Sequence, residues 1–175
     1  MLDVHPNLSS LISTLHNFNS LESIDSNIKS IHLPDRTCND EGYTTLDFSR
    51  FILLEELEIG SNSFKFINKF IIDGMNHLKS LKIGINSFTS KFGDNNSSRS
   101  FQILNCNELE SIEIGPFSFV DYGNRFELVN LPKLSTIKIG ETEVNSSNFY
   151  YSSFEIKSII DMILLMNRSS SFEFH

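Results

Sequence analysis

A short phrase of the pattern apolar-x-x-apolar-x-apolar, followed at once by glycine, occurs four times and constrains this chain more than any other feature. The four copies end at Gly60, Gly84, Gly115 and Gly140. A weaker copy ends at Pro34, and a further variant occupies residues 169–175. Such a repeat predicts a solenoid of stacked coils, a class of fold that usually binds other molecules rather than catalysing reactions.

The distance between successive copies sets the length of one coil. The closing positions 34, 60, 84, 115, 140 and 175 are 26, 24, 31, 25 and 35 residues apart. The shorter distances fit coils of ~25 residues, and the longer ones imply insertions. These insertions are the polar segment 89–100, which is typical of a surface loop, and the apolar segment 159–166.

Two further phrases recur within each coil. Phe-x-Ile or a close variant occurs at 46–48, 70–72, 101–103, 126–128 and 154–156. Ser-Phe follows the early glycines at 63–64, 87–88 and 118–119. Because strand side chains alternate between two faces, each apolar-x-apolar phrase places its apolar residues on one side. We therefore expect a mostly β fold with two short strands per coil, each stacked in parallel on its equivalent in the next coil.

The repeated positions also define the expected core and turns. The core repeat consists of Leu54, Leu57, Ile59, Gly60, Phe64, Leu78, Leu81, Ile83, Gly84, Phe88, Leu109, Ile112, Ile114, Gly115, Phe119, Leu134, Ile137, Ile139 and Gly140. The glycine after the first strand is expected to permit a sharp turn with positive φ. Gly74, Asn105 and Asn130 fit a second turn, since Gly and Asn tolerate left-handed backbone geometry.

Outward positions of the first strand carry charges that alternate in sign from coil to coil. One row consists of His32, Glu58, Lys82, Glu113, Lys138 and Glu173, and a second of Lys29, Glu55, Lys79, Glu110 and Ser135. Stacking places neighbouring members ~4.8 Å apart, and opposite charges contribute ~0.2–1 kcal/mol per pair. These rows form either a binding face for a partner of mixed charge or a solvated face that fixes the stacking register. The alternation favours the register role, because slipped stacking would bring like charges together.

The two ends of the solenoid need caps, because terminal coils otherwise expose apolar core. Apolar residues at 8, 11, 12 and 15 have helical spacing, with Asn7 as a candidate N-cap, and predict a capping helix within residues 1–27. At the other end, residues 156–166 are interpreted as a helix before a last strand at 172–174. The alternative is that residues 162–165 themselves form a strand at the regular spacing.

Composition supports a β fold and excludes some partners. The chain has 175 residues with 16 Phe, no Trp and no Ala, the best helix former. Its net charge of −8 argues against nucleic acid as a partner and favours basic partners. No apolar run approaches the ~20 residues of a membrane span, and the N-terminus lacks the pattern of a secretory signal. We expect a cytoplasmic protein, or an extracellular or surface one if a signal precedes Met1.

Residue clusters that would indicate chemistry are missing from the sequence. The histidines are scattered singly and no Cys/His group has zinc spacing, so we expect no metal, no cofactor and no enzymatic activity. The segments beginning at Asp94 and Asp121 offer too few carboxylates for calcium. Cys106 occupies an apolar repeat position and Cys38 a polar segment more than two coils away, which argues against a disulfide.

These phrases resemble those of leucine-rich repeat proteins, and most closely the bacterial-surface-antigen (BspA-like) type and long leucine-rich repeat proteins of protists. Ser118-Phe119 and its equivalents stand where that type has Ala-Phe, while Pro34 keeps a Pro that is Gly in the other copies. The resemblance covers about residues 20–175. It implies a curved solenoid that binds proteins and carries no catalytic residues.

The sequence thus predicts an N-terminal cap over 1–27 and a leucine-rich-repeat solenoid over 28–175, with about five to six coils that continue or are truncated at the C-terminal end. The expected function is a non-enzymatic protein–protein interaction module. Its contacts are expected on the charged rows and on segment 89–100. The alternatives are a structural or regulatory segment of a larger multidomain protein, or a surface adhesin. The identity of the partner does not follow from the sequence.

Overall fold

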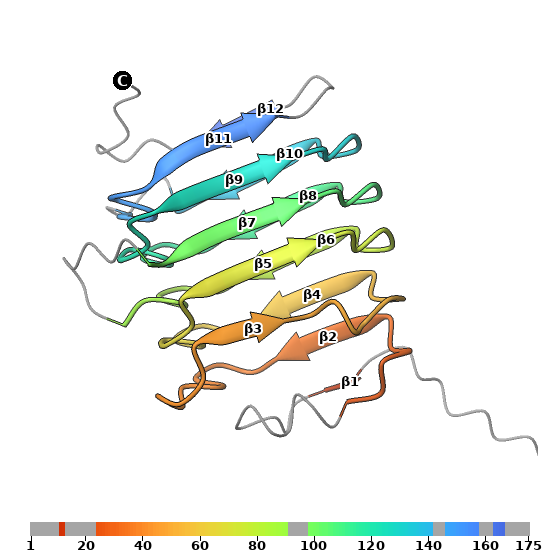
Figure 1. Ribbon diagram of the computed structural model, residues 1–175, viewed down its shortest axis with the longest axis horizontal. Helices are drawn as coiled ribbons and strands as arrows, with labels where there is room; N and C mark the ends of the chain where they lie inside the picture. Colours follow the sequence, from red (N-terminus) through yellow and green to blue (C-terminus); the bar gives the residue numbers. More distant parts are fainter. Residues whose placement is uncertain (1–10, 13–23, 91–97, 142–145, 158–162, 167–175) are drawn as a thin grey trace, which may run out of the picture.

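The computed structural model describes residues 11–12, 24–90, 98–141, 146–157 and 163–166, which form a β-solenoid of two parallel sheets (Figure 1). The seven-stranded sheet A runs in the order β1 (Leu11–Ile12), β2 (Ser30–Leu33), β4 (Glu56–Ile59), β6 (Ser80–Ile83), β8 (Ser111–Ile114), β10 (Thr136–Ile139) and β12 (Ile163–Met166). The five-stranded sheet B runs in the order β3 (Thr45–Asp47), β5 (Lys69–Asp73), β7 (Ser100–Leu104), β9 (Arg125–Val129) and β11 (Ser153–Lys157). The prediction of a mostly β fold with two parallel-stacked strands per coil is confirmed.

The capping helix predicted near the N-terminus is wrong. Leu11 and Ile12 form strand β1, which pairs in parallel with Ile31 and His32 of β2. No helix occurs among the residues that the structure describes. A short isolated helix is marginal in water, whereas an extended segment satisfies the backbone groups at the open edge of β2. Backbone pairing with this edge is therefore favoured over the helix that the spacing of the apolar residues predicts.

The helix predicted over 156–166 is also wrong. Ile156 belongs to β11, and Ile163–Met166 forms β12, which pairs in parallel with β10. The alternative strand at 162–165 therefore lies one residue from the observed one. Leu165 stands beside Lys138 in the register, the place where the repeated phrase predicts Glu173. The expected strand at 172–174 lies outside the described residues.

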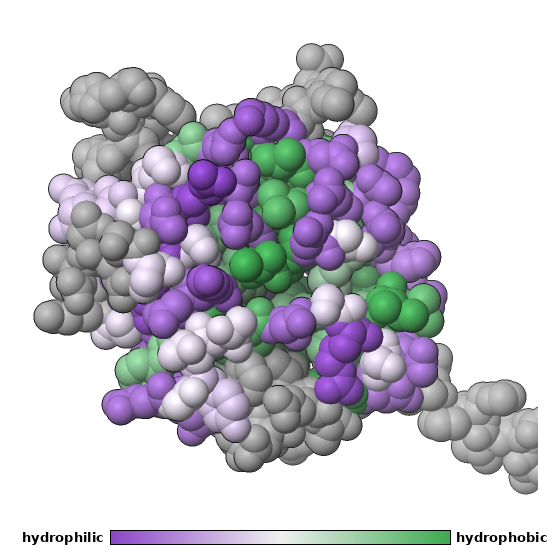
Figure 2. Space-filling model, viewed as in Figure 1, coloured by the Kyte–Doolittle hydropathy of each residue, from purple (hydrophilic) through white to green (hydrophobic). Residues whose placement is uncertain are grey.

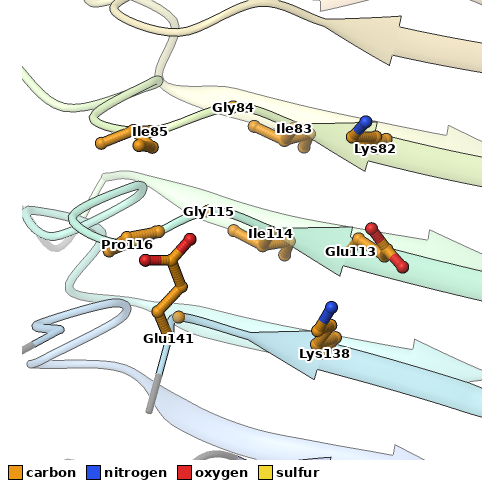
Figure 3. Close-up of a pocket in the computed structure, with 11 residues that line it drawn as sticks. Lys82, Ile83, Gly84, Ile85, Glu113, Ile114, Gly115, Pro116, Lys138 and Glu141 are labelled. Carbon is orange, nitrogen blue, oxygen red and sulfur yellow. The ribbon is translucent and has the colours of Figure 1, made fainter. Parts of the chain in front are cut away.

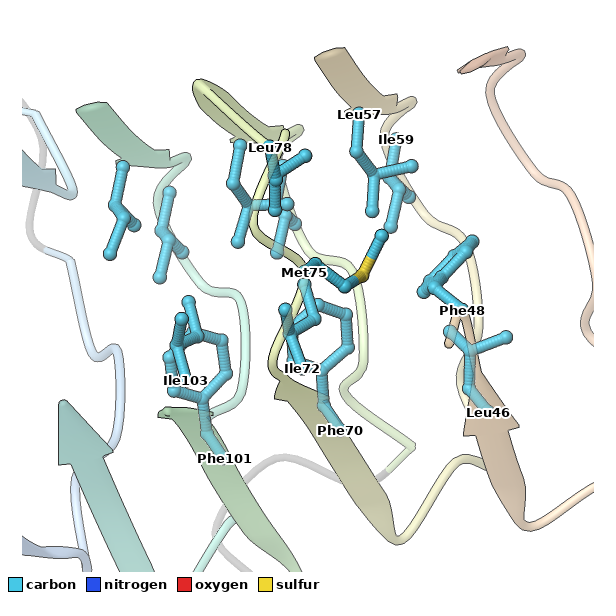
Figure 4. Packing of buried hydrophobic residues seen from close by; sticks show 14 of the residues in the cluster. Leu46, Phe48, Leu57, Ile59, Phe70, Ile72, Met75, Leu78, Phe101 and Ile103 are labelled. Carbon is cyan, nitrogen blue, oxygen red and sulfur yellow. The ribbon is translucent and has the colours of Figure 1, made fainter. Parts of the chain in front are cut away.

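The core between the sheets is packed with leucine, isoleucine and phenylalanine side chains (Figure 4). Its phenylalanines form two ladders. The first ladder stacks the rings of Phe64, Phe88, Phe119 and Phe149 face to face, with centroids 5.2, 4.6 and 4.9 Å apart. The second stacks Phe70, Phe101 and Phe126 at 5.1 Å per step. Rings of one ladder meet those of the other edge to face, at 4.7–5.1 Å between centroids. Both stacking geometries are favourable for aromatic rings, so each coil is held to the next and to the opposite sheet.

Of the four glycines that follow strands of sheet A, Gly140 alone has the expected positive φ, of 76°. The other three do not have the role expected from the sequence. Gly60, Gly84 and Gly115 are required because their neighbours are too close for a side chain. A Cβ on Gly84 would lie 2.6 Å from the backbone N of Ser61, and one on Gly115 would lie 2.8 Å from the carbonyl carbon of Gly84. The second turn is as predicted, since Gly74, Asn105 and Asn130 are all left-handed.

A ladder of buried serines ties the turns of successive coils together. The hydroxyl of Ser87 accepts a hydrogen bond from the backbone N–H of Ser63 at 3.2 Å and donates one to the carbonyl of Gly60 at 2.9 Å. Ser118 repeats this arrangement one coil later, with Ser87 N–H at 3.0 Å and the Gly84 carbonyl at 2.7 Å. Serine thus supplies both a donor and an acceptor where alanine would leave two buried backbone groups unpaired.

Candidate interaction surface

The outward row of sheet A has the register that the sequence predicts. Pairing of the strands places His32 beside Glu58, Glu58 beside Lys82, Lys82 beside Glu113, and Glu113 beside Lys138. We call this row the charge ladder. The register shows which side chains are neighbours, but it does not test the hypothesis that this row binds a partner.

In the N-terminal part of this face, Glu55 and Glu58 are each held by two basic side chains. Glu58 lies 2.9 Å from His32 Nδ1 and 3.1 Å from Lys82 Nζ. Hydrogen bonds from these two partners lower the pKa of Glu58. Glu55 lies 2.7 Å from Lys29 Nζ and 2.5 Å from Lys79 Nζ. These two hydrogen bonds lower the pKa of Glu55 from its ordinary value of 4.5 to about 2.

In the C-terminal part, the carboxylates have no such partners. Lys79 and Lys82 are both bound to carboxylates of the preceding coil, which leaves Glu110 and Glu113 with no ion pair to another described residue. Lys138 likewise forms no ion pair within the described part of the chain. The N-terminal end of this face therefore carries ion-paired side chains. Its C-terminal end carries charges that have no ion pair to another described residue, and we call these the available charges.

A small slot of about 190 Å³ lies beside these available charges (Figure 3). One wall is formed by charged side chains of the ladder, which are Lys82, Glu113 and Lys138. The other wall is formed by residues that follow the glycines, which are Ile85, Pro116 and Glu141. The floor is formed by Ile83, Gly84, Ile114, Gly115 and Gly140. The slot exists because the glycines carry no side chains between the two walls.

Backbone groups in the floor of the slot are already bonded to neighbouring coils. The N–H groups of Gly84, Gly115 and Gly140 each donate to the preceding coil at 2.8 Å. The carbonyl of Gly84 accepts from Ser118 Oγ at 2.7 Å, and that of Gly115 accepts from Asn148 Nδ2 at 2.8 Å. A ligand of this slot therefore meets side chains and the bare backbone surface, and not an open strand edge.

The segment 89–100, expected to contribute contacts, is described at its two ends. Arg99 and Asp121 form a buried ion pair there, 2.8 Å apart, with each side chain 3% exposed or less. The guanidinium also donates to the carbonyls of Lys65 and Phe88, and Ser90 donates to Asp121. This pair is not evident from the sequence, because its members are 22 residues apart and belong to no repeated phrase.

Both cysteines are free and buried. Burial raises the pKa of the Cys38 thiol to about 12, helped by the nearby charge of Asp40, and burial raises that of Cys106 to about 11. Both thiols are thus protonated at neutral pH and poor nucleophiles. The described residues contain no group of three or more His, Cys, Asp or Glu placed to share a metal ion.

The outer face of sheet B carries apolar residues near its centre (Figure 2). Ile71 on β5 is 36% exposed, and Leu104 on β7 and Val129 on β9 are half-buried neighbours in the register of these strands. This face is not among the binding surfaces that the sequence predicts. The signal was the outward position between the two apolar members of the Phe-x-Ile phrase, which is Ile in Phe70-Ile71-Ile72.

No protein-family model, curated protein or solved structure matches this chain. None of the described residues belongs to a helix long and apolar enough to cross a membrane. The functional argument therefore depends on the geometry of the surface.

Proposed function

We propose that this chain is a non-enzymatic interaction module of the leucine-rich repeat type, which binds another protein through the outer face of sheet A. The observation that carries the proposal is the contrast within this face. Glu55 and Glu58 at its N-terminal end are each held by two basic groups, whereas Glu110, Glu113 and Lys138 have no ion pair within the described residues.

A parallel solenoid suits this role because its outward side chains are held at fixed spacing by the stacked strands beneath them. The binding groups are thus arranged before the partner arrives, which reduces the entropy lost on association. The charges of such a face steer encounter and select partners more than they supply affinity. A coil length of ~25 residues and the repeated apolar phrases support assignment to the leucine-rich repeat type.

The proposal can be tested with a photo-crosslinking amino acid placed at Ser111 on the outer face of sheet A, and at Gln102 on the outer face of sheet B as the matched control. Both positions are half-buried, outward and central in their sheets. We expect a discrete crosslinked protein from position 111 and not from position 102. That protein, once purified, should bind the unmodified chain directly, and Glu110→Lys should weaken its binding by about tenfold, or ~1.4 kcal/mol.

Two results would contradict the proposed function. One is the same set of crosslinked proteins from both positions, which would indicate random collision. The other is direct binding that the Glu110→Lys variant leaves unchanged while a substitution on sheet B weakens it.

A further inference from the structure

The slot beside the charge ladder has the size of one side chain. Its volume of about 190 Å³ is below the ~300–1,000 Å³ of pockets that enclose metabolites. It is open along the face of sheet A, where a partner surface can lie over it (Figure 3). Its occupant is therefore a side chain that projects from a partner protein.

The partner's backbone contributes little to recognition at this place. The N–H groups of Gly84, Gly115 and Gly140 and the carbonyls of Gly84 and Gly115 all have partners in neighbouring coils. Addition of a strand from the partner requires unpaired backbone groups. Selectivity must then come from the side chains that form the two walls.

The charges of the walls favour a cation. Lys82 is 3.1 Å from Glu58, a residue outside the slot, so the charge of Lys82 is already balanced. Of the remaining charged lining residues, Glu113 and Glu141 are carboxylates and Lys138 is an ammonium, and none has an ion pair to another described residue. The slot thus presents two available negative charges against one positive charge, on a chain of net charge −8.

The apolar parts of the slot favour a long, flat cationic side chain. Ile85, which is 45% exposed, and Pro116 offer contact to a methylene stem, and the glycines allow a planar group to approach the backbone. Arginine combines such a stem with a planar guanidinium that binds carboxylates at two points, whereas lysine ends in a compact, strongly hydrated charge.

We propose that the slot lined by Glu113, Glu141, Ile85 and Pro116 receives an arginine side chain from a basic segment of the partner protein. This inference rests on the proposed function, since it names the chemistry that the same face recognises. Lys138 competes with the arginine for Glu113, its neighbour in the register, and so limits the affinity of the slot.

The test is a titration of the ¹⁵N-labelled 175-residue protein with acetyl-Gly-Arg-Gly-amide, followed by two-dimensional NMR. The amide signals of Gly84, Gly115 and Gly140 report on the floor directly. The peptide with citrulline in place of arginine is the control, because it has nearly the same shape and no charge. We expect saturable shifts centred on the three glycines, with binding of the citrulline peptide about tenfold weaker.

The test is made specific by variants that should weaken binding and by one that should strengthen it. Glu113→Gln combined with Glu141→Gln should weaken binding of the arginine peptide by about tenfold or more. Glu41→Gln combined with Glu56→Gln changes the net charge equally at exposed sites outside the slot and should leave binding within about twofold. Lys138→Gln should strengthen binding. Retained signal dispersion shows that each variant is folded.

Several outcomes would overturn the inference: equal binding of the arginine and citrulline peptides, shifts spread over acidic sites elsewhere, or equal weakening by the two double variants. If crosslinking from position 111 succeeds while the arginine peptide leaves the glycines unchanged, the arginine site is wrong and the proposed function stands. If the peptide binds in the slot but position 111 yields no crosslinked protein, the proposed function fails instead.

Discussion

The interior and the exterior of this solenoid carry ladders of side chains with the same period. The two kinds of ladder differ in how tightly their neighbours constrain each side chain. Inside, Phe88 and Phe119 stack at 4.6 Å and are fully buried, so any change leaves a void or a clash. Outside, Glu113 and Lys138 are neighbours in the register but form no ion pair with each other. Internal ladders therefore fix the coil, whereas the external ladder is less constrained.

The largest effect should come from breaking the phenylalanine ladder. Phe119→Ala removes a ring that stacks on Phe88 and Phe149 and meets Phe101 edge to face. We expect a loss of about 3–5 kcal/mol in the free energy of unfolding, measured by chemical denaturation. Ile52→Ala is the matched control: Ile52 is 64% exposed, and its loss should cost under ~0.5 kcal/mol. Similar losses of unfolding free energy in the two variants would mean that interior and exterior side chains are equally constrained.

The buried ion pair extends the same comparison to charges. Asp121→Asn leaves Arg99 buried without its counter-charge, and we expect a loss of about 3–5 kcal/mol in unfolding free energy. Replacing both partners with Arg99→Met and Asp121→Leu should cost clearly less, because no lone charge remains buried. A double variant as unstable as the single one would show that hydrogen bonds to Lys65 and Phe88 dominate here.

The close approach of the coils at the glycine row should produce an intermediate effect. In Gly115→Ala the new Cβ lies 2.8 Å from the carbonyl carbon of Gly84, so the backbone of one coil must shift. We expect a loss of about 1–3 kcal/mol in the free energy of unfolding, measured by thermal or chemical denaturation. Gly42→Ala, which has nothing within 4 Å of the new Cβ, should be neutral or slightly stabilising. Equal stability of the two variants would mean that the coils are not in contact at Gly115.

These glycines mark one limit of what the sequence predicts. Alternation of apolar and outward residues has a period of two, so repeated phrases determine which residues face the core and which lie side by side. The register of Glu58, Lys82 and Glu113 therefore follows from the repeated phrases alone. Whether a repeated glycine serves a positive φ or a close approach depends on the neighbouring coil, which the sequence does not place.

The termini and the slot mark the other limit. Spacing of apolar residues near Leu11 fits a helix, but the open edge of β2 offers backbone pairing that local spacing does not reveal. The candidate binding residues were identified as a row, whereas the slot depends on Ile85, Pro116 and Glu141, which follow the glycines and share no residue type. Their common feature is position around a turn, which becomes visible once the coils are stacked.

A smaller effect should come from reversing one charge of the ladder. Lys82→Glu places like charges beside both Glu58 and Glu113, and we expect a loss of about 1 kcal/mol in unfolding free energy, since each exposed pair contributes ~0.2–1 kcal/mol. Glu41→Lys, at an exposed turn outside the ladder, is the control and should cost less. If both changes cost the same, the ladder has no role in setting the register of the coils.

The smallest effect is the pH dependence of Glu55, which belongs to the second charged row of the same face. Its pKa is about 2 in the folded chain, because Lys29 and Lys79 donate hydrogen bonds to its charged form, against 4.5 for the free side chain. Unfolding therefore raises the pKa, so the unfolded state binds more protons in this range and the stabilisation by Glu55 decreases as pH falls. The difference in unfolding free energy between the unmodified chain and Glu55→Gln should be constant above about pH 5.5 and should shrink between pH 4.5 and about 2. When Lys29→Gln and Lys79→Gln remove both donors, the same difference should change much less with pH, and an unchanged profile would mean that these hydrogen bonds do not stabilise the charged form of Glu55.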